Sequence, residues 1–168
     1  MLIALTLQQL KDTSRSIYLY DTYGGMAEPS SVDIGLLDGS DAGEMWKKNK
    51  RDDHNDWCYA SLKEVKKNMS LTKYPSKKLF FVKGDVLETI PKTVTDRISL
   101  LRLDTDWYKS TKHELVHLYP LVSRGGVLII DDYGCWAGSR KAVDEYFAKG
   151  PAPFLARVDH TGRVAIKR

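Results

Sequence analysis

Two short apolar runs, residues 98–103 and 127–130, are the feature of this sequence that most restricts its fold. Each has the length of a β-strand, and each is rich in leucine, isoleucine or valine, as in strands that are covered on both faces of a sheet. Between them, Leu115, Leu118 and Val122 recur at helical spacing. A strand, a helix and a second strand in this order predict a parallel pair joined by a right-handed crossover.

The rest of the chain continues this alternation of strands and helices. Ser61 and Glu64 form a capping box, a serine followed three residues later by a glutamate, which predicts the start of a helix. Thr111 with Glu114 repeats the pattern, and Ser139 is a third candidate cap. The predicted elements are strands at 16–20, 78–82, 98–103 and 127–130, helices at 2–10, 61–69, 111–122 and from 139 to before Gly150, and a hairpin of 154–158 with 163–166. The predicted fold class is therefore α/β, a parallel sheet with helices on both faces and a C-terminal antiparallel hairpin.

Acidic residues follow all four of the predicted strands. Asp21 follows the first strand, Asp85 the second, Asp104 the third, and Asp131 with Asp132 the fourth. A single acid at such a place is most often a turn or cap residue. Ligands of open α/β sheets bind beyond the carboxyl ends of the strands, so four acidic strand ends predict a site at that edge.

Asp104, Asp131 and Asp132 are the candidate metal ligands. Two adjacent carboxylates at the end of a buried strand repel each other unless a cation or hydrogen bonds offset their charge. With Asp104 on the neighbouring strand, they offer the oxygen ligands that a hard divalent ion such as Mg²⁺ prefers. The alternative is that the pair caps the next segment and Asp104 is a turn residue. The spacing alone leaves both readings open.

Asp21, Gly84 and Asp85 are the candidate nucleoside-binding residues. An acidic side chain after a strand of a nucleotide-binding sheet can accept hydrogen bonds from ribose hydroxyls, which is the role predicted for Asp21. Asp85, beside the permissive Gly84, is placed to accept from an adenine amino group. Alternatively, Asp21 stabilises the turn at Gly24-Gly25 and Asp85 caps the turn that follows it.

Composition and missing motifs exclude several other classes of protein. The net charge is +4, and the basic residues gather within 46–78, where a solvated surface is favoured over a nucleic-acid interface. No apolar run has the length of a membrane span, and the N-terminus does not read as a signal peptide. Cys58 and Cys135 have no metal-ligand spacing, so free thiols and a cytoplasmic location are expected. Nucleophile-elbow and phosphate-loop motifs are absent, and His113 with His117 reads as a helix surface.

The chain resembles the macrocin O-methyltransferase family of class I, S-adenosylmethionine-dependent methyltransferases. The resemblance covers nearly the whole chain and is most specific in Asp-x-Asp-x-Tyr-x-Ser-Thr at 104–111 followed by Asp-Asp-Tyr at 131–133. Further matching segments are 21–29, 57–60, 82–86, 89–91, 118–120, 125–126 and 142–146. The resemblance implies a Rossmann-like fold and methyl transfer to a hydroxyl of a deoxysugar in a macrolide or related product.

The resemblance also implies roles for the candidate residues. Asp104, Asp131 and Asp132 hold Mg²⁺, and Asp104 is in addition the general base for the acceptor hydroxyl. S-adenosylmethionine is the second cofactor, the segment 27–57 forms part of a lid, and the partner is a sugar or glycoside. No nucleic-acid or membrane partner is expected, and a homo-oligomer is compatible with this reading.

The chain departs from the family pattern in two ways. Thr105 and Trp107 stand where the family has glycine and leucine. The family's first strand and its glycine-rich turn have no counterpart, since the sequence begins in the helix that would follow them. We therefore expect a single, N-terminally incomplete domain over 1–168, with weakened cofactor binding and a gap in the sheet that another segment or chain fills. The alternative function is a non-catalytic remnant that acts as an interaction module.

Overall fold

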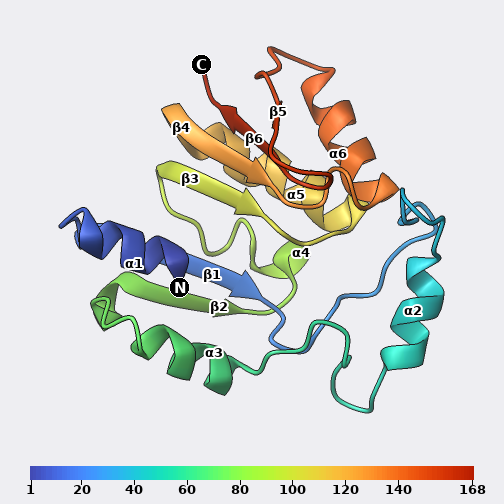
Figure 1. The fold of residues 1–168 in the computed structure, drawn as a ribbon, viewed down its shortest axis with the longest axis horizontal. Coiled ribbons are helices and arrows are strands. Elements are labelled where there is room, and N and C mark those ends of the chain that lie inside the picture. The colour runs from blue at the N-terminus through green and yellow to red at the C-terminus, as the bar shows by residue number, and fades with distance from the viewer. The chain divides into compact units, whose positions relative to one another are not determined.

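The computed structural model describes all 168 residues, which divide into two compact units (Figure 1). We call residues 1–27 and 49–85 the N-terminal unit, and residues 28–48 and 86–168 the C-terminal unit. Each unit has its own β-sheet. Every helix is too short or too polar to cross a bilayer.

The N-terminal unit is built on two parallel strands, β1 (Ile17–Asp21) and β2 (Leu79–Lys83). Its helices are α1 (Leu2–Gln9), α3 (Leu62–Ser70) and the short 3₁₀ turn η1 (Ser76–Lys78). Alternate side chains of the strands, such as Ile17 and Leu19, pack on a small core of Ala4, Met69 and Tyr74. The helices therefore supply the apolar cover that a two-stranded sheet needs to be stable.

The C-terminal unit contains a four-stranded sheet with the order β3-β4-β6-β5. The strands are β3 (Ile98–Leu103), β4 (Val122–Ile130), β5 (Ala156–Arg157) and β6 (Arg163–Ile166). The helical segments are α2 (Ala42–Asn49, whose last residue lies in the N-terminal unit), α4 (Val86–Thr89), α5 (Tyr108–Leu118), η2 (Tyr119–Leu121) and α6 (Ala137–Phe147). β3 and β4 run parallel, whereas β6 is antiparallel to β4, which confirms the predicted fold class and its C-terminal hairpin.

The prediction that residues 98–103 are covered on both faces was wrong. Leu101 and Leu103 are buried, but Leu100 is 41% exposed and Arg102 is exposed as well. β3 is an edge strand of the four-stranded sheet and follows an alternating pattern, with one face in the core of its unit. Val122, predicted to belong to a helix, begins β4 instead.

Of the three predicted helix caps, only Ser61 is one. Its hydroxyl accepts a hydrogen bond from the backbone N–H of Glu64 at 3.2 Å. Thr111 and Ser139 lie buried inside α5 and α6, which begin at Tyr108 and Ala137. Tertiary contacts decided these starts, because the free N–H groups of a first turn donate to a remote acceptor as readily as to a local one.

Candidate active site

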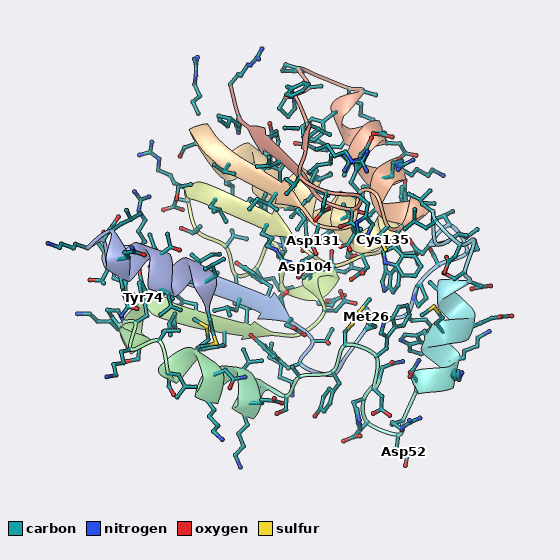
Figure 2. The ribbon with its side chains drawn as sticks, viewed as in Figure 1. Met26, Asp52, Tyr74, Asp104, Asp131 and Cys135 are labelled. Carbon is teal, nitrogen blue, oxygen red and sulfur yellow. The ribbon has the colours of Figure 1, made fainter.

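Asp104, Asp131 and Asp132 come together at the carboxyl ends of β3 and β4. The register pairs Leu103 with Ile130, and the backbone N–H of Asp131 donates to Leu103 O at 3.0 Å. One carboxylate oxygen from each of the three aspartates lies within 4.8 Å of the other two. Asp104 and Asp131 lie side by side in Figure 2. The geometry allows a shared cation, while metal binding itself stays a prediction.

Arg102 is the cation that contacts these carboxylates. It lies two residues before Asp104 in β3, so both side chains project from the same face of the strand. Its guanidinium forms ion pairs with Asp104 and, at 3.1 Å, with Asp131. Sequence reasoning missed Arg102, although the two-residue period of a strand was enough to place it beside Asp104.

Asp106 connects the two loops that carry the carboxylates. Its backbone has a positive φ of 63°, which aspartate tolerates better than most residues. The backbone N–H of Asp106 donates to Asp132 Oδ2 at 3.3 Å, and its own carboxylate accepts from the Trp136 indole at 3.0 Å. The loop after β3 is therefore hydrogen-bonded to the loop after β4 through a single residue.

Glu114 is a fifth acid beneath this cluster, and it was not predicted as a site residue. It lies in α5, is only 5% exposed, and accepts a hydrogen bond from the Thr105 hydroxyl at 2.8 Å. Thr105 occupies the position where the resemblance leads one to expect glycine. The hydroxyl that this departure adds is thus paired inside the unit rather than left without a partner.

Burial and mutual repulsion raise the pKa values of four acids in this region. Burial is the main cause in each case, and the neighbouring carboxylates add to it. The pKa of Asp104 and of Asp106 rises to about 6, that of Asp132 to about 7 and that of Glu114 to about 8. Such crowding is relieved by protons or by a cation, and it is the electrostatic character expected of a functional site.

Asp33 ties the part of the predicted lid that lies in the C-terminal unit to the helices of that unit. Its carboxylate is almost completely buried and accepts from the backbone N–H of Tyr108 at 2.8 Å, which caps α5 from a distance of 75 residues. Gly138 makes this possible, because a Cβ there would lie 1.8 Å from Asp33 Oδ1. Backbone bonds from Leu36 to Cys135 and from Ala137 to Ile34 hold the same segment against the loop that follows Asp132. The lid role of 27–57 stays a prediction.

Asp21, Gly84 and Asp85 lie together at the carboxyl ends of β1 and β2 in the N-terminal unit. The backbone N–H of Gly84 donates to Asp21 O at 3.0 Å. Asp21 Oδ1 accepts from the backbone N–H of Tyr23 at 2.6 Å, so this carboxylate does stabilise the turn that follows β1. The cofactor role of the three residues stays a prediction.

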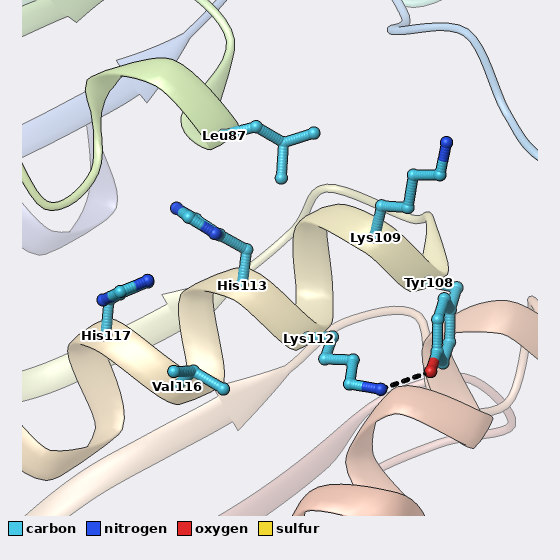
Figure 3. Close-up of a pocket in the computed structure, with 7 residues that line it drawn as sticks. All are labelled: Leu87, Tyr108, Lys109, Lys112, His113, Val116 and His117. Atoms are coloured by element: carbon cyan, nitrogen blue, oxygen red, sulfur yellow. Dashed lines mark hydrogen bonds between the residues drawn. The ribbon is translucent and has the colours of Figure 1, made fainter.

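A shallow groove on the surface of α5 and α4 is lined by His113 and His117, the histidine pair spaced four residues apart in the sequence (Figure 3). His113 Nε2 lies 2.8 Å from Ile90 O, and the rings of His113 and His117 are 4.4 Å apart between centroids. Lys112 bonds to the Tyr108 hydroxyl and to Glu145. These contacts within the unit fit the helix-surface reading of the histidine pair.

The chain matches an O-methyltransferase family over nearly its full length. The family described as macrocin O-methyltransferase (TylF) matches residues 1–165. The 8-demethyl-8-(2,3-dimethoxy-alpha-L-rhamnosyl)-tetracenomycin-C 4'-O-methyltransferase of Streptomyces olivaceus is 31% identical over 152 residues, covering 90% of this chain and 54% of that protein. Demethyldecarbamoylnovobiocin O-methyltransferase of Streptomyces niveus is 38% identical over 103 residues, covering 61% of this chain and 39% of that protein. The chain therefore spans about half the length of these relatives or less.

Solved structures agree with this assignment. The O-methyltransferase NovP superposes with a TM-score of 0.82 and 28% identity, covering 99% of this chain and 65% of NovP. The calicheamicin methyltransferase CalS11 superposes with a TM-score of 0.71 and 16% identity, covering 98% of this chain and 65% of CalS11, and this likeness shows the fold alone. From the family match and these relatives, the chain belongs to the macrocin O-methyltransferase family.

Proposed function

We propose that this chain catalyses the Mg²⁺-dependent transfer of a methyl group from S-adenosylmethionine to a hydroxyl of a sugar or glycosylated small molecule. The observation that carries the proposal is the meeting of Asp104, Asp131 and Asp132 within 4.8 Å at the ends of two adjoining strands. The relatives named above act, by their names, on a rhamnosyl tetracenomycin and on a novobiocin precursor, which supports a glycosylated natural product as the acceptor.

The three carboxylates fit Mg²⁺ by their chemistry. They offer hard oxygen donors, and an ion held by only three protein ligands could still take water or two acceptor hydroxyls as further ligands. When bound, the ion would lower the pKa of a coordinated hydroxyl. Asp104, Asp131 and Asp132 would hold it, and the bond from Asp106 N–H to Asp132 orients one of these ligands.

Asp104 is the proposed general base for the acceptor hydroxyl. Its carboxylate lies beside those of Asp131 and Asp132, so it would be within reach of an acceptor hydroxyl bound at the same place and could take up the proton. When bound, S-adenosylmethionine would supply the electrophilic methyl group and would leave as S-adenosylhomocysteine once that methyl has passed to the acceptor oxygen. The methyl group is already electrophilic, so the contribution of the protein is mainly position and proton removal.

Asp21, Gly84 and Asp85 are the proposed cofactor contacts. Asp21 would accept hydrogen bonds from the ribose hydroxyls, and Asp85 would accept one from the adenine amino group. Gly84, with a φ of 141°, has no side chain to keep the nucleoside away from the backbone. The cytoplasmic location, the lack of nucleic-acid and membrane partners and the homo-oligomer remain predictions.

The test is methyl transfer from radiolabelled S-adenosylmethionine to a rhamnose-bearing tetracenomycin, with Mg²⁺ or with EDTA. We expect label in the glycoside only with Mg²⁺, and its loss in D131N/D132N. Asp96→Asn is the control, because Asp96 is an exposed acid of the same unit. Transfer that survives EDTA would disprove the metal-dependent mechanism. A chain that binds neither Mg²⁺ nor S-adenosylhomocysteine would instead support the interaction module.

A further inference from the structure

Arg102 contacts two of the three candidate metal ligands at once. Its two terminal nitrogens reach separate carboxylates, that of Asp104 directly after β3 and that of Asp131 directly after β4. It is the only cation that forms an ion pair with Asp104, Asp131 or Asp132. The side chain of Arg102 is 44% exposed, so it is held at this place by its two ion pairs more than by packing.

We propose that Arg102 is a built-in competitor of the divalent ion, which keeps the affinity of the carboxylate site low. This inference rests on the proposed function, since it concerns the same three ligands. The guanidinium neutralises part of the charge that attracts the ion, and it uses Asp104 Oδ2 and Asp131 Oδ1 as partners. A divalent ion bound by the same carboxylates has to share them with Arg102 or displace it.

Two effects of Arg102 on metal binding oppose each other. As an outer-sphere partner, it orients the carboxylates, and the loss of such a partner weakens metal binding in many sites. As a positive charge, it repels the ion, by an amount on the order of tenfold in affinity for a water-like dielectric at a separation of a few ångströms. Asp104 and Asp131 already start from adjoining, hydrogen-bonded strands, and Asp132 is held by Asp106. Because the backbone supplies most of the orientation, we expect repulsion to decide the sign.

The experiment is a calorimetric titration of the full chain with Mn²⁺ alone, at pH 8.5 so that the ligands are ionised in every variant. Arg102→Gln removes the charge, and Arg102→Lys keeps it while losing the two-pronged geometry. Arg124→Gln is the matched control, since Arg124 is an arginine near the opposite end of β4 from the carboxylates. We expect R102Q to bind Mn²⁺ about tenfold more tightly than the wild type. R102K should stay within about threefold, and R124Q should be unchanged.

Equal or weaker binding by R102Q would overturn the proposal, as would the absence of binding in both proteins. Binding by R102Q alone, with a wild type too weak to measure, supports it. Arg102→Met, which keeps the aliphatic stem, replaces R102Q if circular dichroism shows that the latter is unfolded. Methyl transfer is assayed separately with Mg²⁺ or EDTA. A metal-independent transferase whose R102Q variant still gains Mn²⁺ affinity would disprove the proposed function and not this inference.

Discussion

The acids at the strand ends of the two units differ in how their charge is satisfied. In the N-terminal unit, Asp21 accepts a backbone hydrogen bond from its own turn. In the C-terminal unit, Asp104, Asp106 and Asp132 crowd one another, and burial raises the pKa of each. A locally satisfied acid suits a neutral hydroxyl or amino partner, whereas a crowded group needs a cation or a proton. We therefore predict two different chemistries for acids at the same position in the fold.

The cores of the two units differ as well. The buried apolar cluster of the N-terminal unit has three members, Ala4, Met69 and Tyr74. The largest fully buried side chains all belong to the C-terminal unit, and they are Ile90, Leu103, Leu115, Leu128, Ile130, Val143, Asp33 and Ser139. The candidate metal ligands are therefore attached to the better-packed unit, and rigid support is what a precise ligand geometry requires.

The largest expected effect is the loss of methyl transfer in Asp104→Asn. This change removes both a metal ligand and the general base, so we expect kcat/KM to fall on the order of a thousandfold. Asp85→Asn in the other unit should mainly raise the KM for S-adenosylmethionine. Steady-state kinetics measure kcat and KM for both variants. An equal fall in kcat for the two would contradict the assignment of catalysis to Asp104 and of cofactor binding to Asp85.

Leu128→Ala tests the difference between the cores. Leu128 is completely buried in β4, and its truncation should lower the free energy of unfolding by about 3 kcal/mol. Met69→Ala, in the smaller core, should cost less. Urea unfolding measures both changes, and hydrogen exchange would show whether each loss is confined to its own unit. A larger cost for Met69→Ala would reverse the ranking of the two cores.

Glu114→Gln probes the crowding of acids by pH. The ordinary pKa of this carboxyl is 4.5, and burial raises it to about 8, so between these values the folded protein binds a proton that the unfolded chain releases. Its contribution to stability is therefore present at low pH and is lost as the pH rises from about 4.5 to 8. In the wild type this group makes the free energy of unfolding fall as the pH rises. We expect that slope to be smaller in E114Q by about 1.4 kcal/mol per pH unit in this window.

Unfolding free energies at pH 5, 6, 7 and 8 give this slope. Glu88→Gln is the control, because the Glu88 side chain is 78% exposed in the same unit. A slope for E114Q equal to that of the wild type would mean that Glu114 titrates as an ordinary surface acid.

The smallest effect is expected for Asp21→Asn. Asparagine keeps the acceptor for the Tyr23 N–H but loses the negative charge, so S-adenosylhomocysteine should bind about tenfold more weakly. The affinity for Mn²⁺ should not change. Calorimetry with each ligand separates the two sites, and a parallel loss of Mn²⁺ binding would contradict their independence.

Much of the fold was predictable because its signals are local. Predicted strands such as 98–103, and the Ser61 cap, depend on side-chain alternation and on contacts three residues apart. The convergence of Asp104 with Asp131 and Asp132 was also predictable, since parallel strands that adjoin bring their carboxyl ends together. The start of α5 could not be predicted, because the side chain that caps it belongs to Asp33, which is 75 residues away in the chain.

The sequence by itself determined the approximate positions of the four parallel strands and the presence of acids at their carboxyl ends. Only the tertiary structure decided that Arg102 pairs with two of these acids, that Glu114 is buried beneath them, and that β3 is an edge strand. The physical reason is range: periodicity and turn chemistry act over a few residues, whereas burial and ion pairing depend on segments that only folding brings into contact.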